Sequence, residues 1–158
     1  MIPRDPASKV MSWNAMREWR TDFWGRVVFT NGVFDLVHPG HVDVLRAART
    51  AGDALVVGVN SDQSVRRLKG ESRPVRSQIE RAYVVAALEF VDVVTIFEED
   101  TPLELVQALE PDVIAKGGDY SESTIVGAAE VRARGGEVLV IPLTPGQSTT
   151  SIIERMRG

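Results

Sequence analysis

The stretch "FTNGVFDLVHPGHVDVLRAA", from Phe29 to Ala48, holds both histidines of the 158-residue chain, His38 and His41. It begins inside an apolar, β-branched run and passes, after a Pro-Gly pair, into a segment whose apolar residues recur at helical spacing. Proline is favoured at the first position of a helix, so we expect this helix to begin at Pro39. A strand, a loop and a helix in this order are typical of an α/β sheet.

Five short runs rich in β-branched residues recur along the chain. Each is apolar throughout and does not alternate, which is typical of strands buried on both faces of a sheet. They are RVVFTN (26–31), ALVVGVN (54–60), DVVTIF (92–97), DVIAKG (112–117) and EVLVIP (137–142). Between them lie helical segments, and Ser77 and Thr101 can each cap one, with a glutamate three residues later. The alternation predicts a Rossmann-like α/β fold, a doubly wound five-stranded parallel sheet with helices on both faces.

Residues 1–24 fall outside this alternation and hold all three tryptophans, Trp13, Trp19 and Trp24. Two interpretations of this N-terminal helical arm stay open. Its aromatic side chains either dock it onto the domain or bind a partner or a second copy of the chain. Since a chain of this length provides one core, we divide it into the arm (1–24) and a single domain (25–158).

The composition restricts the classes of partner. The net charge of −4 provides no diffuse electrostatic attraction for nucleic acid or an acidic membrane surface. The absence of cysteine excludes a disulfide framework and a thiolate metal site, as is usual in a reducing compartment. The N-terminus has neither the apolar stretch of a signal peptide nor a membrane span of about 20 apolar residues. We therefore expect a cytoplasmic protein that binds neither nucleic acid nor a membrane.

The first run ends where a ligand is expected. Ligands of open parallel sheets bind beyond the carboxyl ends of the strands, near the point where the strand order reverses. Thr30, Asn31 and Gly32 end that run, so the residues from Thr30 to His41 should line the crevice. His38 and His41 then lie about one turn apart at the positively polarised end of a helix. Two imidazoles and several free amides in a crevice are suited to a polyphosphate.

The histidine pair is also compatible with two simpler roles. A histidine at a helix start can cap the helix or lie on the surface without further function. His38 and His41 have a spacing that can chelate zinc, but the chain has no third histidine and no cysteine to complete the metal's ligands. The chain lacks the Gly-Lys-Ser/Thr signature of a P-loop, and no Gly-x-Gly-x-x-Gly follows the first run. Any nucleotide is therefore bound in another way.

The opening stretch resembles the first signature of the nucleotidyltransferase superfamily, in which a G-x-F-D segment precedes an H-x-G-H tetrapeptide. The matching residues are Gly32, Phe34, Asp35, His38, Gly40 and His41. "GQSTTSIIERM" (146–156) resembles the second signature, a Ser/Thr-rich start to a helix. The two signatures are far apart in the sequence, and their co-occurrence is much more specific than either one alone.

Within that superfamily, residues 26–158 are most similar to the bacterial D-glycero-β-D-manno-heptose 1-phosphate adenylyltransferases. Beyond the first signature, the matching stretches are "GDALVVGVNSDQSVRRLKGESRPV", "FEEDTPLELVQALEPDVIAKGGDY", "GGEVLV" and "STTSII". The resemblance implies transfer of AMP from ATP to the sugar 1-phosphate, giving ADP-heptose and pyrophosphate for lipopolysaccharide or glycan precursors. It also implies Mg²⁺ held mainly by the phosphates, a homodimer or larger homo-oligomer, and a separate sugar kinase, to which this domain is often fused.

The resemblance further implies roles for individual residues. The catalytic residues would be His38, His41 and Lys69, the histidines by donating to phosphate oxygens and the lysine by reaching the reacting phosphates from a mobile loop. The nucleotide would contact Thr30, Asn31, Gly32, Phe34, Gly40, Lys116, Gly118, Asp119, Ser148, Thr149 and Thr150. The sugar phosphate would contact Asp35, Asn60, Arg73 and Arg81. Ordinary capping, tight-turn and helix-surface roles for these residues stay open.

Two alternative functions also stay open. Cytidylyltransferases for glycerol 3-phosphate or choline phosphate tend to have a G-D-D-W-like stretch and an arginine where this chain has Gly118, Tyr120 and Leu143. These departures favour adenine over cytosine. The other alternative is a catalytically idle nucleotide-binding domain held to a partner by the tryptophan-rich arm, although none of the signature residues is replaced.

Overall fold

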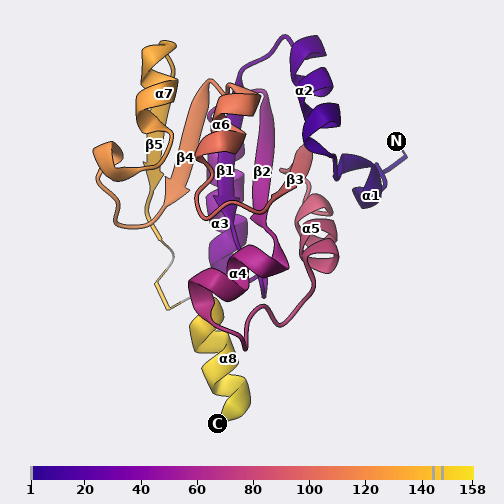
Figure 1. Cartoon of the computed structure of the whole chain (residues 1–158), viewed down its shortest axis with the longest axis vertical. Coiled ribbons are helices and arrows are strands. Elements are labelled where there is room, and N and C mark those ends of the chain that lie inside the picture. The colour runs from indigo at the N-terminus through magenta and orange to yellow at the C-terminus, as the bar shows by residue number, and fades with distance from the viewer. Residues whose placement is uncertain (1, 144, 147) are drawn as a thin grey trace.

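The computed structural model describes residues 2–143, 145–146 and 148–158. At its centre is a five-stranded parallel sheet in the order β3-β2-β1-β4-β5 (Figure 1). The strands are β1 (Val27–Gly32), β2 (Ala54–Asn60), β3 (Val93–Phe97), β4 (Val113–Gly117) and β5 (Glu137–Ile141). The predicted Rossmann-like fold is confirmed, and the strand order reverses between β1 and β4.

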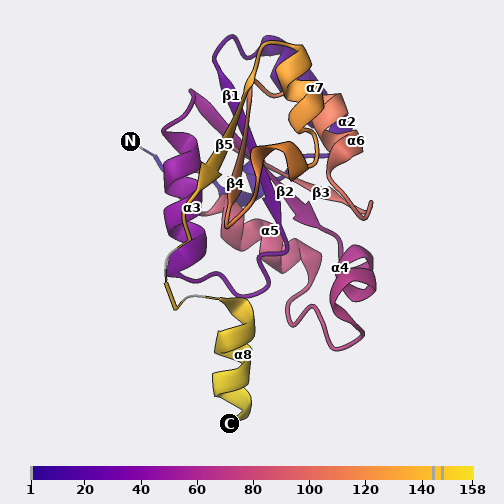
Figure 2. The same cartoon turned by 90° about the vertical axis from the view of Figure 1, so that its left-hand side faces the viewer.

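Helices cover both faces of the sheet (Figure 2). They are α1 (Pro6–Lys9), α2 (Trp13–Asp22), α3 (Pro39–Arg49), α4 (Asp62–Lys69), α5 (Gln78–Ala86), α6 (Leu103–Leu109), α7 (Ala128–Ala133) and α8 (Thr149–Arg157), with a 3₁₀ turn at Glu122–Thr124. Neighbouring strand residues point to opposite faces. Val28 therefore packs in one apolar cluster with α3 and α5, whereas Val27 and Phe29 pack in another with α2, α6 and α7. Among the described residues, no helix is long and apolar enough to span a membrane.

The edge strand β5 differs from the sequence-based expectation. Only Ile141 of its five residues is buried, because β5 has a neighbour on one side alone. The predicted helix start at Ser77 is confirmed, since the Ser77 hydroxyl accepts from the Glu80 amide and the Glu80 carboxylate accepts from the Ser77 amide. The capping box expected at Thr101 is wrong. There α6 is preceded by Pro102 and has no side-chain cap.

The N-terminal segment lies along the β3 edge of the sheet. Val10 forms a parallel bridge with Val94, and the Met11 amide donates to the Val94 carbonyl over 2.8 Å. The Thr95 hydroxyl donates to the Met11 carbonyl over 2.9 Å. Lys9 is buried, and its Nζ donates to the carbonyls of the turn after α5. These bonds extend the sheet edge with residues from the arm.

The three tryptophans of this segment have different surroundings. Trp13 packs against the core, and its Nε1 donates to the Ile96 carbonyl over 2.9 Å. Trp19 also packs against the core and stacks on Phe23 of the same arm, with ring centroids 4.9 Å apart. Trp24, in contrast, is 98% exposed. Two tryptophans thus contribute to docking of the arm, and the boundary between arm and domain stays a prediction.

Candidate active site

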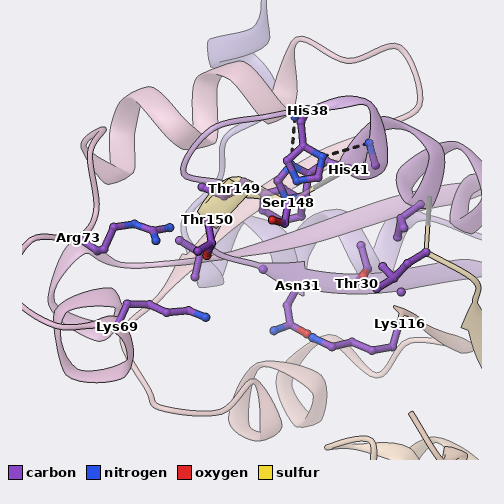
Figure 3. A pocket seen from close by; sticks show the side chains of 17 residues that line it. Thr30, Asn31, His38, His41, Lys69, Arg73, Lys116, Ser148, Thr149 and Thr150 are labelled. Atoms are coloured by element: carbon purple, nitrogen blue, oxygen red, sulfur yellow. Dashed lines mark hydrogen bonds between the residues drawn. The ribbon is translucent and has the colours of Figure 1, made fainter. Parts of the chain in front are cut away.

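A cavity of about 360 Å³ opens at the carboxyl edge of the sheet, where the strand order reverses (Figure 3). Its walls come from the ends of β1 and β4, the start of α3, the end of α4 and the start of α8. Of the residues predicted for the site, it brings together Thr30, Asn31, Gly32, Phe34, His38, Gly40, His41, Lys69, Arg73, Lys116, Ser148, Thr149 and Thr150. These residues come from segments that are far apart in the sequence and meet at one edge of the sheet.

The two imidazoles stack at the start of α3, with ring centroids 3.8 Å apart. His38 Nδ1 accepts from the Gly40 amide over 3.1 Å, and His41 Nδ1 accepts from the His38 amide over 3.3 Å. A ring nitrogen that accepts from an N–H carries no proton, so these bonds assign the proton of each neutral ring to Nε2. Each imidazole therefore caps the helix with one nitrogen and keeps the other as a donor for a ligand in the cavity.

Burial keeps both histidines neutral. Desolvation, with a smaller contribution from the neighbouring His38, lowers the pKa of His41 from 6.5 to about 4. Desolvation also lowers the pKa of His38. Burial disfavours the charged form of an imidazole, so at neutral pH both rings offer uncharged Nε2–H donors. Without a ligand, the positive charge at the cavity therefore comes from Lys69, Arg73 and Lys116.

The lowered pKa of His41 predicts a stability change with pH. Between about 4 and 6.5 the unfolded chain binds more protons than the folded chain, so the free energy of unfolding falls as the pH drops through this window. We expect urea unfolding to show lower stability at about pH 5 than at about pH 7.5, and a smaller difference in His41→Gln. The lowered pKa of Asp35 acts only below this window. If the free energy of unfolding of His41→Gln fell by as much as that of the wild type between about pH 7.5 and pH 5, the prediction would be contradicted.

Cationic side chains reach the cavity from opposite sides. Figure 3 shows Lys69 and Arg73 extending into it from one side and Lys116 from the other. Lys69 is the last residue of α4, and Gly70 follows with φ 99°, which favours glycine. Desolvation lowers the pKa of Lys116. Cations on two sides, together with the starts of α3 and α8, form a site suited to a polyanion.

The start of α8 closes the cavity. Ser148 caps this helix by accepting from the Ser151 amide over 3.0 Å, and Thr149 Oγ1 donates to the Leu36 carbonyl over 3.3 Å. The latter bond ties α8 to the loop that precedes the histidines. Beyond this first turn α8 extends past the sheet, and none of its residues is buried (Figures 1 and 2). Gln147, part of the second signature, lies outside the described residues.

Asp35 lies outside this cavity. Its carboxylate is fully buried and accepts from Arg73 Nε over 2.7 Å and from the amides of Val75 and Arg76 over 2.8 and 3.0 Å. Burial, the largest single influence, raises its pKa. The bonds from Arg76, Val75 and Arg73 together outweigh burial and lower the pKa below its ordinary value. The ionised carboxylate thus anchors the segment that follows Lys69.

Arg81 is also fully buried and makes a second set of bonds to the same region. Its Nε donates to the Arg76 carbonyl over 3.0 Å, and its Nη1 donates to the carbonyls of Val33 and Asn60 over 2.7 and 2.8 Å. Its Nη2 binds the Asp62 carboxylate over 2.8 Å. All three guanidinium nitrogens therefore donate to protein acceptors. Through these bonds Arg81 connects the loop after β1 to α4 and to the segment before α5.

Three further predicted residues do not line the cavity. Asn60 is buried, and its amide donates to Ser64 Oγ over 3.0 Å. Gly118 is buried with φ 129°, and its amide donates to the Ile141 carbonyl. Asp119 is exposed. The structure thus separates these residues from the histidines and Lys69.

The apolar end of the cavity is formed by Val44, Gly117 and Leu143. The glycine pair and Leu143 were noted in the sequence, but Val44 of α3 was missed. A Cβ on Gly117 would lie 2.7 Å from Val44 Cγ2, so α3 packs directly on the bare strand. The signal in the sequence is the pair of glycines after Lys116, which is equally typical of a tight turn. Among the described residues, no group of three or more His, Cys, Asp or Glu side chains could hold a metal ion.

Comparisons with known proteins agree with the two signatures. A family model described as cytidylyltransferase-like matches residues 29–155. The bifunctional protein HldE of Rhodopseudomonas palustris (strain HaA2) is 62% identical over 142 residues, which are 90% of this chain and 29% of the relative. The protein of the same name from Methylobacillus flagellatus is 52% identical over 149 residues, or 94% of this chain. The chain spans 29% of the length of these curated relatives.

Solved structures share the fold. The lipopolysaccharide core biosynthesis protein from Thermoplasma volcanium has a TM-score of 0.62 at 27% identity, covering 76% of this chain and 97% of that one. A pantoate-β-alanine ligase from Francisella tularensis has a TM-score of 0.62 at 13% identity, covering 92% of this chain and 72% of that one, and shows the fold alone. With its histidine signature at the reversal of a five-stranded parallel sheet, and with a match over residues 29–155, this chain belongs to the cytidylyltransferase-like family.

Proposed function

We propose that this protein transfers AMP from ATP to D-glycero-β-D-manno-heptose 1-phosphate, giving ADP-heptose and pyrophosphate for lipopolysaccharide or glycan precursors. The observation that carries the proposal is the stacked pair His38 and His41, which line a cavity with cations on two sides and whose Nδ1 atoms accept from backbone amides, so that Nε2–H remains as the donor of each ring. The match to bifunctional HldE proteins and the likeness to a lipopolysaccharide core biosynthesis protein support the sugar class.

The proposed reaction is a single displacement. An ionised oxygen of the sugar phosphate attacks the α-phosphorus of ATP, and the bond from the α-phosphorus to the bridging oxygen breaks as pyrophosphate leaves. No protein nucleophile is needed, so the residues act by positioning the two anions and by stabilising charge on the phosphates. His38 and His41 donate to oxygens that become more negative, while Lys69 and Arg73 on one side of the cavity and Lys116 on the other compensate the charge.

The apolar end of the cavity is suited to the adenine base. Val44, Leu143 and the bare backbone at Gly117 offer a surface against which a planar ring can lie. The phosphates then extend past α3 toward the start of α8, where Ser148, Thr149 and Thr150 supply hydroxyls and free amides. Mg²⁺ bound to these phosphates would neutralise part of their charge. Since the described residues form no acidic metal cluster, we propose that it enters with ATP.

Three wider assignments belong to the same proposal. We place the protein in the cytoplasm, as expected for a cysteine-free biosynthetic enzyme in whose described residues no helix could span a membrane. A separate sugar kinase would supply the sugar 1-phosphate. A homodimer or larger homo-oligomer is proposed from the family resemblance.

Pyrophosphate release tests the reaction and its nucleotide. With ATP and the heptose 1-phosphate, we expect turnover that requires both substrates and added Mg²⁺. CTP should support turnover at least about tenfold less well, which needs only ~1.4 kcal/mol of differential transition-state binding. Equal or better use of CTP would favour a polyol-phosphate cytidylyltransferase. Tight nucleotide binding without turnover would favour the idle binding domain.

A further inference from the structure

A group of arginines lines a second cavity, of about 250 Å³, at the opposite edge of the sheet from the histidines. Its walls are the residues that lead into β1, β4 and β5, together with the end of α2, so it lies at the amino ends of these strands. Figure 1 shows the ends of α2 and α7 at this end of the sheet, opposite α8. The cationic residues of this cavity are Arg20, Arg26 and Arg134, and its acidic residues are Glu110 and Asp112.

The donors of Arg20 are poorly satisfied by the protein. Its Nη1 donates to the Phe23 carbonyl over 3.3 Å, and its Nη2 donates to the Glu110 carbonyl over 3.3 Å and to Asp112 Oδ2 over 3.2 Å. These distances lie at or beyond the long end of the usual range for N–H···O bonds, about 2.7–3.2 Å. Its Nε is buried, and in the part of the chain that the structure describes it is the one buried side-chain nitrogen or oxygen without a hydrogen-bond partner. Since an unsatisfied buried donor is costly, this guanidinium has capacity for a further acceptor.

The other two arginines are held as loosely. Arg134 is exposed, and its Nη2 lies 3.4 Å from the Pro111 carbonyl. Arg26 donates to one backbone carbonyl over 3.2 Å and pairs with the exposed Glu137 carboxylate over 3.1 Å, an ion pair of the kind that contributes little at a surface. The buried Arg81, in contrast, donates to its protein acceptors over 2.7–3.0 Å. The arginines of the second cavity therefore keep donors for a ligand.

The charge and size of the cavity indicate a small oxyanion. Three guanidinium groups line it against two carboxylates. The Glu110 side chain is exposed, and Asp112 Oδ2 already accepts from the Val27 amide over 2.8 Å as well as from Arg20. The volume is below the range of about 300–1,000 Å³ that is usual for pockets enclosing drug-sized ligands. Guanidinium groups match the geometry of phosphate oxygens, which they bind in pairs.

We propose that this cavity binds a phosphate group, either free or as the monoester of a small metabolite, with Arg20 and Arg134 donating to its oxygens. The Nε–Nη2 edge of Arg20 is suited to two parallel bonds, in which the phosphate shares Nη2 with Asp112 and is the sole partner of Nε. Binding ties α2 of the N-terminal arm to the segment between α7 and β5. This site is separate from the histidine cavity, and the inference is independent of the proposed reaction.

Tryptophan fluorescence tests the site, because Trp19 adjoins Arg20 and all three tryptophans lie within residues 1–24. Titration of the wild type with inorganic phosphate, at constant ionic strength set with sodium chloride, is expected to give a saturable change in emission. Arg134→Gln should raise the phosphate Kd about tenfold, the scale of one lost bond to a charged group. Arg17→Gln is the matched control, since Arg17 is an exposed cation of α2 that does not line the cavity. Its Kd should stay within about twofold of the wild type.

Two further variants separate this site from misfolding and from the histidine cavity. Arg20→Lys keeps the charge but lacks the two-nitrogen edge, so it should also raise the Kd about tenfold, while urea unfolding shows whether the fold is kept. Lys69→Ala, in the histidine cavity, should leave the Kd within about twofold. The absence of a saturable change in the wild type would overturn the proposal. So would an equal loss in Arg17→Gln, or a loss in Lys69→Ala that Arg134→Gln does not share.

Glycerol 3-phosphate distinguishes the two sources of the phosphate group. Tighter binding than that of inorganic phosphate would identify a small phosphate monoester as the ligand, and equal or weaker binding would identify free phosphate. Both results support the site, provided that Arg134→Gln weakens the binding. These titrations contain neither nucleotide nor sugar 1-phosphate. A failure of the phosphate site therefore leaves the proposed reaction intact, and a failure to release pyrophosphate leaves the phosphate site intact.

Discussion

Replacement of His38 or His41 by alanine is expected to lower turnover by roughly a hundredfold or more, the scale seen when one preorganised oxyanion donor is lost. The reason is the orientation of the rings. Backbone amides hold both Nδ1 atoms, so each Nε2–H is fixed before the nucleotide arrives. Both donors act on one transition state, and the double variant should therefore lose less free energy of activation than the sum of the single losses.

A matched variant separates catalysis from capping. His38 is the N-cap of α3, and loss of such a cap costs about 1 kcal/mol of stability. Asparagine is among the best N-cap residues, so His38→Asn keeps an acceptor for the Gly40 amide but has no donor at the position of Nε2. We expect it to unfold in urea much as the wild type does and to lose turnover as severely as His38→Ala. Full activity in the alanine variants would show that both imidazoles act only as helix caps. Stoichiometric zinc in the purified wild type, lost when either histidine is replaced, would show instead that the two histidines bind a metal ion.

The part of the site that was predictable from the sequence is local. His38 and His41 lie within one helical turn of Pro39, so a single capped helix start places both rings at the end of β1. The alternation of strands and helices predicted a parallel sheet with right-handed connections, whereas the strand order, with β4 beside β1, is seen only in the structure. Ser148 and Thr149 are remote in sequence, but they too open a helix, and the resemblance of the second signature identified them.

The part that could not be predicted depends on contacts between distant segments. Asp35 is a plausible ligand for a hydroxyl until Val75 and Arg76, some 40 residues away, are seen to donate to it. Arg81 likewise reaches Val33 across 48 residues. A buried charge is stabilised only where acceptors or donors surround it, and the pairing of these segments is a property of the fold. For the same reason composition could not distinguish the exposed Trp24 from the tryptophans that are packed.

These buried bonds determine how Lys69 is presented. Lys69 ends α4 and lies on the exposed side of the cavity, followed by Gly70 at φ 99° and then by the segment that Asp35 anchors. The anchor fixes the far end of this loop, while a side chain at Gly70 would meet nothing within 4 Å, so the near end is held by backbone bonds alone. A loop with so little side-chain packing at its near end can bring the adjoining cation onto the phosphates after both substrates are bound.

Lys69→Ala is accordingly expected to lower turnover by roughly a hundredfold, as removal of one transition-state contact does, while the Kd for ATP without sugar changes by only about twofold. Pyrophosphate release and calorimetry measure the two quantities on the same preparation. Arg66→Ala is the matched control, because Arg66 is an exposed cation of the same helix that does not line the cavity, and both quantities should stay at wild-type values. Near-normal turnover in Lys69→Ala would show that this lysine is a solvated surface residue of α4 with no role in catalysis. An equal loss in both variants would instead show that the net positive charge of the helix attracts the substrates, with no specific contact from Lys69.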